Sequence, residues 1–222
     1  YGVIRCSEEI GRRMGLQAED MELAKLIALL HDIGRFEQLK RFNSFEADTM
    51  DHATYGVKVL FEEGMIRQFI EEDTWDDVIR TAIAKHSDYE LTGITDERTL
   101  LHARLIRDAD KLDNCRVKLE DAMETLLDLS ADEVGKYAIS PKVREDAFAG
   151  KCICSKDRRT PMDYWVSYVA YFYDLNFQET LDIVAEEQYV KRIIGRVPYT
   201  NEQTKKTMEE LERQLTEYVR RK

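Results

Sequence analysis

The chain has 222 residues, 43% of them hydrophobic and 35% charged, and its formal net charge is −11. This composition is typical of a folded globular protein and excludes a disordered chain. The acidic charge disfavours nucleic-acid polymers and anionic lipid as partners, and no apolar run approaches the roughly 18 residues of a membrane span. The four cysteines lack the spacing of zinc-ligand pairs. We therefore expect reduced thiols in a cytoplasmic protein that binds neither a nucleic-acid polymer nor a membrane.

Few turn-forming residues interrupt the chain, which has 10 glycines and 3 prolines. Apolar residues recur at helical spacing, so the sequence predicts an all-α fold. The predicted helices cover, in chain order, residues 1–14, 18–33, 51–63, 65–72, 74–86, 97–127, 130–150, 162–173, 176–194 and 200–221. Residues 35–49 are predicted to form a long connection, and Gly34 to end the helix before it as a C-terminal glycine.

We expect a helical core over residues 1–125, with further helices over residues 126–222 packing on it within one domain. The final helix carries an apolar stripe that we expect to pack back onto the bundle: Met208, Leu211, Leu215 and Tyr218. An aromatic face formed by Trp165, Tyr168 and Phe172 has two interpretations. One is core packing or a contact between two copies, which leaves a homodimer open; the other is a wall on which a nucleotide base stacks.

Four separate helices carry side chains suited to binding a metal. His31 and Asp32 directly follow the apolar run L-I-A-L-L, His52 lies in the first turn of the next helix, His86 ends another, and Asp110 lies within the long helix. Helical bundles build metal sites from side chains that converge from facing helices. A polar His-Asp pair after an apolar run also needs a partner if it is buried. The spacing therefore indicates a shared metal site.

The remaining histidine, His102, lies eight residues before Asp110 on the same predicted helix. Eight residues correspond to about 12 Å along a helix axis, which is too far for both side chains to bind one ion. We therefore exclude His102 from the ligand set.

Four short segments, taken in this order, resemble the motifs of the HD-domain superfamily of metal-dependent phosphohydrolases. They are H-D-I-G-R at 31–35, H-A-T-Y-G at 52–56, K-H-S at 85–87 and D-A-D-K-L-D at 108–113, and the resemblance covers about residues 1–120. It implies an all-helical fold and two divalent transition metals (Mn, Fe, Ni, Co or Zn, with Mg left open). The implied metal ligands are His31, Asp32, His52, His86 and Asp110, with Asp32 bridging the two ions.

The resemblance implies one further ligand, a histidine on the first helix, which we expect two positions before Tyr1. His31 and Asp110 would bind one metal together with this histidine, and His52 and His86 would bind the other. Two such ions can activate a bridging hydroxide for in-line displacement at phosphorus.

We expect hydrolysis of a small phosphorylated metabolite or nucleotide, with cationic and amide side chains beside the ligands binding the substrate. These are Arg35, Lys85, Lys111 and Asn114; Lys111, like Asp32, is also expected to act in catalysis. Arg35 and Phe36 stand where the guanosine-tetraphosphate hydrolases of the superfamily carry an acidic pair, and the G-Y-P motif of its cyclic-dinucleotide phosphodiesterases is absent. Two alternatives stay open: an HD-fold di-iron oxygenase with the same ligands, and a non-enzymatic nucleotide or ligand sensor.

Overall fold

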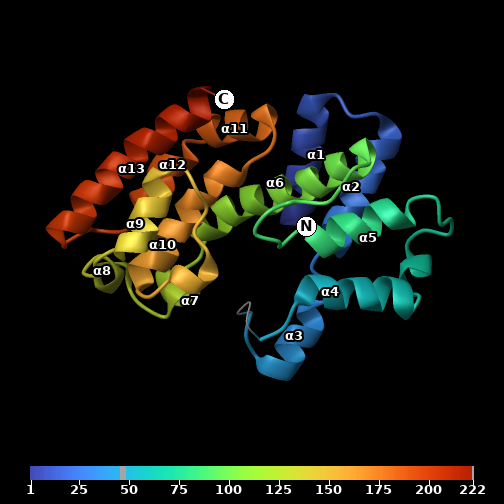
Figure 1. Cartoon of the computed structure of the whole chain (residues 1–222), viewed down its shortest axis with the longest axis horizontal. Helices are drawn as coiled ribbons and strands as arrows, with labels where there is room; N and C mark the ends of the chain where they lie inside the picture. The colour runs from blue at the N-terminus through green and yellow to red at the C-terminus, as the bar shows by residue number, and fades with distance from the viewer. Residues whose placement is uncertain (46–48, 222) are drawn as a thin grey trace. The chain divides into compact units, whose positions relative to one another are not determined.

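A computed structural model of the chain describes residues 1–45 and 49–221. Over these residues the chain forms helices joined by turns and contains no strand (Figure 1), which confirms the all-α prediction. None of the helices in this described part is both long enough and apolar enough to cross a membrane.

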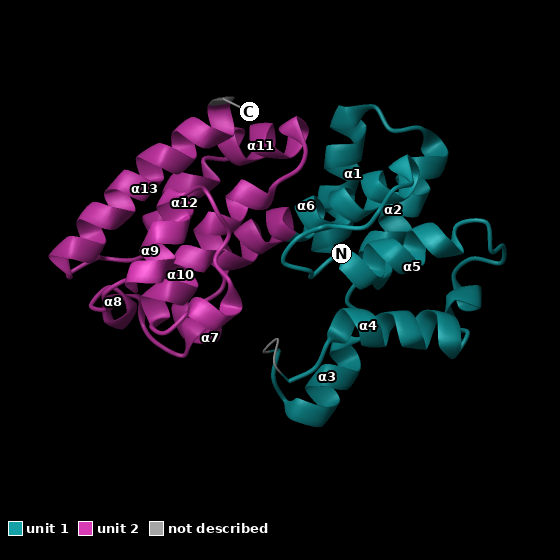
Figure 2. Ribbon diagram, in the orientation of Figure 1, with its two compact units in different colours: residues 1–110 teal, residues 111–222 magenta. Residues whose placement is uncertain are grey.

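The chain forms two compact units, Tyr1–Asp110 and Lys111–Lys222 (Figure 2), and the long helix α6, Glu97–Glu120, runs through the boundary. The division predicted from the sequence, a core over 1–125 and added helices over 126–222, stays a prediction. All five candidate metal ligands belong to the first unit.

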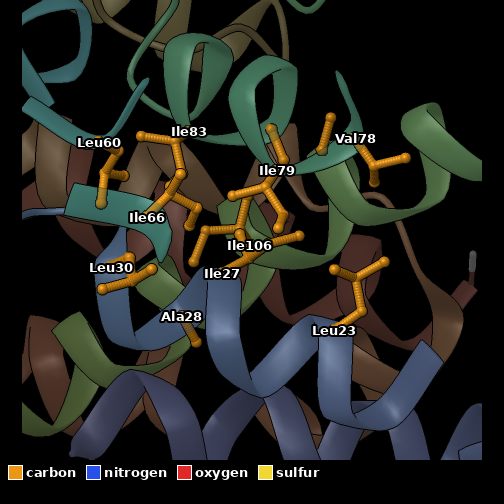
Figure 3. Close-up of a cluster of buried hydrophobic side chains, with 12 residues drawn as sticks. Leu23, Ile27, Ala28, Leu30, Leu60, Ile66, Val78, Ile79, Ile83 and Ile106 are labelled. Atoms are coloured by element: carbon orange, nitrogen blue, oxygen red, sulfur yellow. The ribbon is translucent and has the colours of Figure 1, made fainter. Parts of the chain in front are cut away.

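The first unit contains the first part of α6 and seven shorter helical elements. These are α1 (Gly2–Met14), α2 (Ala18–Leu30), α3 (Arg35–Phe42), α4 (His52–Val57), a π-helical turn (Lys58–Glu62), a 3₁₀ turn (Met65–Gln68) and α5 (Asp76–Lys85). Its apolar core joins α2, α5 and α6 through Ile27, Ile79 and Ile106, each no more than 1% exposed (Figure 3). Burial of these side chains packs α2, α5 and α6 together, and His31 and His86 directly follow the C-terminal ends of α2 and α5.

Local signals in the sequence set several helix ends as predicted. Gly15 ends α1 in the left-handed region at φ 71°, which glycine adopts without the strain of a Cβ. Asp51 caps α4, and its Oδ1 accepts a 3.0 Å hydrogen bond from the Thr54 backbone N–H. Gly64, at φ 77°, follows the π-helical turn that continues α4.

The prediction of a long connection over residues 35–49 was wrong, because α3 occupies its first half. Glu37 and Arg41 pair across one turn of this helix at 2.6 Å, as helix-stabilising side chains do at this spacing. The apolar residues of α3 did not indicate a helix because they have no buried face: Phe36 is 80% exposed and Phe42 47%. Residues 46–48 of the predicted connection lie outside the described residues.

Three predicted helices are divided in the structure. The helix predicted over 130–150 consists of two, α8 (Ala131–Val134) and α9 (Pro141–Phe148), which are separated between Gly135 and Pro141. The helix predicted over 97–127 ends at Glu120, and a separate short helix, α7, covers Met123–Leu127. The helix predicted over 176–194 is interrupted by Gln188, which has the left-handed φ of 51°. Neither of the last two breaks involves a glycine or a proline, so no local pattern in the sequence indicated it.

The second unit is also helical. Besides α7 it contains α8 (Ala131–Val134), α9 (Pro141–Phe148), α10 (Pro161–Ala170), α11 (Gln178–Glu186), α12 (Tyr189–Ile194), α13 (Glu202–Arg221) and 3₁₀ turns at Ser155–Asp157 and Tyr171–Asp174. Trp165 and Phe172 are fully buried, which agrees with the core-packing interpretation of the aromatic face. Met208, Leu211 and Leu215 of α13 are fully buried as well, so this helix packs against the unit as expected.

Candidate metal centre

The turn after α2 carries His31 and Asp32 to the centre of a cluster formed by the five predicted ligands. Asp32 Oδ1 lies 3.3 Å from His52 Nε2 and 3.5 Å from His86 Nε2, whereas Asp32 Oδ2 lies 3.6 Å from His31 Nε2. Asp110 Oδ1, from α6, lies 3.8 Å from the same His31 nitrogen. The structure therefore brings together all five side chains, and the three histidines are buried.

Hydrogen bonds to backbone carbonyls orient two of the imidazole rings. His31 Nδ1 lies 2.9 Å from the Ala28 oxygen, and His86 Nδ1 lies 2.7 Å from the Ile83 oxygen. A carbonyl only accepts, so each Nδ1 carries a hydrogen and donates it, which leaves a lone pair on Nε2 of the neutral ring. Both Nε2 atoms face the carboxylate of Asp32. This arrangement is typical of metal-binding histidines, whose second nitrogen donates to a carbonyl or carboxylate.

Several electron-pair donors consequently face one another in a small space. His52 Nε2 and His86 Nε2 are 3.1 Å apart. Within the described residues, the buried His31 Nε2 has no hydrogen-bond partner. Such a group of nitrogen and carboxylate donors needs either a proton or a cation between its members. Imidazole and carboxylate ligands together suit divalent transition metals, and the residues present therefore fit a metal centre.

Mutual attraction within the cluster shifts the pKa values of its carboxyl groups. Burial alone would raise the pKa of Asp32, but His52 and His86 outweigh it and hold this pKa well below its ordinary value. Burial also opposes ionisation of Asp110, yet His31 lowers its pKa overall. Both carboxylates are consequently ionised at neutral pH and available to a cation.

His31 responds in the opposite direction. Burial tends to lower the pKa of this imidazole, but the carboxylates of Asp110 and Asp32 outweigh the effect of burial and raise it. In the metal-free protein, His31 therefore binds a proton more readily than a free imidazole does. A metal ion at this nitrogen would have to displace that proton.

Gly34 and Gly56 allow the turn with His31 and Asp32 to lie directly against α4. A Cβ added to Gly34 would lie 2.0 Å from the His52 carbonyl oxygen and 2.8 Å from the Gly56 nitrogen. Gly34 has a φ of −68° and precedes α3, so its prediction as a C-terminal glycine was wrong. Its lack of a side chain provides space for a close approach between two backbones, and this places Asp32 beside His52.

The residues predicted to bind substrate differ in their surroundings. Arg35 Nε lies 3.3 Å from Asp32 Oδ1, and its Nη1 donates to Gln38 Oε1 at 3.0 Å and to the Phe45 carbonyl at 3.1 Å. Lys85 pairs with Asp88 at 2.8 Å. Lys111 belongs to the second unit, where it pairs with Asp174 at 2.8 Å, and Asn114 follows it on α6. Substrate binding by these four residues stays a prediction.

His102 lies in a different set of contacts, as expected. Its Nε2 is 2.9 Å from Asp20 Oδ1, and Arg98 Nε donates to the same oxygen at 2.7 Å. Arg107 was not predicted from the sequence; it is a buried residue whose side chain contacts the backbone at the end of α5. Its position three residues before Asp110, on the same helix face, was the available signal.

Comparison with known families agrees with this geometry. A family model described as the HD domain matches residues 1–115, a range that includes all five clustered side chains. The chain belongs to the HD-domain family. HD domains typically bind divalent metals, and the family consists generally of hydrolases. Comparison with curated proteins and with solved structures finds no match.

Proposed function

We propose that this HD-domain protein is a metal-dependent phosphohydrolase acting on a small phosphorylated metabolite or nucleotide. The observation that carries the proposal is the position of the Asp32 carboxylate, which has His31 Nε2 near one oxygen and His52 and His86 Nε2 near the other, at 3.6, 3.3 and 3.5 Å. A carboxylate with donors on both sides is suited to bridging two ions.

The chain would hold each ion with a different set of side chains. His31 and Asp110 approach each other to 3.8 Å and would bind one ion, whereas His52 and His86, 3.1 Å apart, would bind the other. Asp32 would contribute one oxygen to each. When bound, two divalent ions supply a nucleophilic hydroxide and offset the charge of the phosphoryl group.

Arg35 provides a fixed positive charge beside this centre. Its Nε contacts Asp32, and its Nη1 is held by the side chain of Gln38, which is itself fully buried, and by the Phe45 carbonyl. A guanidinium held in this way keeps its orientation with little loss of side-chain entropy when an anion binds. We propose that it binds the phosphoryl oxygens, whereas Lys85 would have to exchange Asp88 for the substrate.

Two measurements on the protein test the proposal: its metal content, and its release of phosphate from phosphomonoesters and nucleotides with added Mn²⁺, Co²⁺ or Ni²⁺. Asp110→Asn should lose an ion and reduce turnover by about 100-fold or more, because the ions supply several kcal/mol of transition-state stabilisation. Asp113→Asn is the matched control. It is the same substitution on the same helix, and Asp113 pairs with Arg116 at 2.9 Å.

Three results would contradict the proposal. Absence of bound metal after metal addition would exclude the metal centre. Iron with a mixed-valence signal and oxygen uptake on an organic substrate would indicate an oxygenase instead. Nucleotide binding without turnover in the metal-loaded protein would indicate a sensor.

A further inference from the structure

Arg107 is a buried charge that the proposed reaction does not use directly. The residue is only 2% exposed. Its Nη1 donates hydrogen bonds to three carbonyl oxygens, those of Lys85, His86 and Asp88, at 3.1, 3.3 and 2.5 Å. Burying a guanidinium is costly unless acceptors surround it, so these carbonyls account for its position.

The three carbonyls belong to the C-terminal end of α5 and the turn that follows it. The last carbonyls of a helix have no partner within the helix and carry partial negative charge. Many helices satisfy them with a glycine in the left-handed conformation, but His86 continues in the right-handed region at φ −64° and ψ −31°. Here the Arg107 guanidinium, from α6, binds these carbonyls instead. No glycine is then needed after α5, and a histidine can occupy that position.

His86 is consequently held at two points. Its ring Nδ1 donates to the Ile83 carbonyl at 2.7 Å, and its own carbonyl accepts from Arg107 at 3.3 Å. With backbone and ring both fixed, Nε2 faces Asp32 Oδ1 at 3.5 Å. Loss of the Arg107 hydrogen bonds would release the turn that carries this ligand.

Arg107 also connects two predicted ligands from different helices. It lies three residues before Asp110 on α6, so both side chains leave the same face of that helix. We infer that Arg107 is a positioning residue, which fixes His86 relative to Asp110. It thereby keeps His86 in place to bind the second ion, the one that His86 would share with His52. The inference rests on the proposed function, because it assigns His86 a metal.

Metal binding by the full chain, measured with Mn²⁺ alone, tests the inference without any substrate. Arg107→Met keeps an unbranched apolar stem and removes the donors. We expect one ion to bind as in the unaltered protein and the second about 10- to 100-fold more weakly, the usual effect of losing a group that orients a ligand. Arg107→Lys should recover part of the affinity, since it retains the charge but not the planar guanidinium.

Arg196→Met is the matched control, because Arg196 Nη1 also donates to a backbone carbonyl, that of Lys118, within the second unit. It should lower thermal stability and leave both ions bound. His86→Ala should weaken the same ion as Arg107→Met, and the double variant should lose little more than His86→Ala alone, since both changes act on one ligand.

The outcomes separate this inference from the proposed function. If His86→Ala loses the second ion but Arg107→Met retains it, Arg107 is only a helix cap and the inference is overturned. If the unaltered protein binds no metal, the proposed function itself fails. Should Arg107→Met not fold, Arg107→Lys decides: weaker binding of the second ion alone supports the inference, and unchanged binding contradicts it.

Discussion

At the scale of single residues, Gly34 has less room for a side chain than Gly56, the glycine that faces it beside the candidate ligands. The atoms nearest to an added Cβ are backbone atoms of His52 and Gly56, at 2.0 and 2.8 Å, and backbone cannot rotate away as a flexible side chain can. Any larger residue must therefore separate the turn that contains His31 and Asp32 from the first turn of α4. This separation would move Asp32 away from His52.

We expect Gly34→Ala to weaken Mn²⁺ binding and to lower the free energy of unfolding by about 1–3 kcal/mol, the usual cost of overpacking. Isothermal titration with Mn²⁺ and thermal unfolding measure the two effects. Gly64→Ala is the control: Gly64 has a φ of 77° and no atom within 4 Å of an added Cβ. It should be destabilised by backbone strain but bind metal normally. Unchanged metal affinity in Gly34→Ala would show that metal binding does not depend on the close approach of the two backbones at Gly34.

At the scale of elements, α2 and α6 are joined by a polar contact far from the metal ligands. His102 of α6 and Arg98, one turn earlier, both contact Asp20 in the first turn of α2, and the Arg98 guanidinium lies 3.8 Å from the centre of the Trp75 ring. Burial lowers the pKa of His102 below its ordinary value of 6.5, although Asp20 opposes the shift. Asp32 follows α2 and Asp110 lies on α6. This contact therefore helps to hold the two helices that position these ligands.

We expect His102→Gln to leave the metal content unchanged and to lower the free energy of unfolding by about 1–3 kcal/mol, through loss of a buried hydrogen bond. A group whose pKa is lowered by folding contributes stability above its ordinary pKa, here 6.5, and this contribution falls as the pH decreases below it. The difference in stability between the two proteins should therefore shrink on acidification. Urea unfolding of the metal-free proteins over a pH series measures it, and loss of an ion in His102→Gln would show that the ligand set is misassigned.

At the scale of the whole molecule, the chain is acidic, with 44 aspartate and glutamate residues against 33 lysines and arginines. Two of its carboxylates lie among the three buried histidines. A phosphorylated substrate would be repelled from such a protein unless bound cations reverse the local charge. Metal binding and substrate binding should accordingly be linked.

The stabilisation that Mn²⁺ gives the protein should increase with pH. In the metal-free protein the raised pKa of His31 contributes stability that is complete below the ordinary value of 6.5 and is lost as the pH rises through the raised pKa. Metal binding requires the neutral imidazole and replaces the proton above that range. We expect the rise in melting temperature on Mn²⁺ addition to grow between about pH 6 and about pH 8. A constant rise across this range would contradict binding at His31.

The helical fold class and several helix ends depended on local features that can be recognised in the sequence. Apolar periodicity indicated the helices, and Gly15, Asp51 and Gly64 lie at the ends that they predicted. The order of the histidine and aspartate motifs likewise identified the five side chains that lie together in the structure. Local propensity did not reveal α3, because its apolar residues remain exposed and leave no buried stripe.

Local patterns in the sequence indicated most of the helices, though not α3 or the divisions within the predicted helices, and they identified the candidate side chains of the site. The way these side chains are held depends on tertiary contacts. The space at Gly34 depends on the backbone of His52, and the role of Arg107 depends on carbonyls about twenty residues earlier in the chain. Such contacts join segments that are far apart in sequence, so their distances depend on the packing of α2, α4, α5 and α6 around a shared core. No periodicity or capping signal within one segment carries that information, because it arises when the segments are buried together.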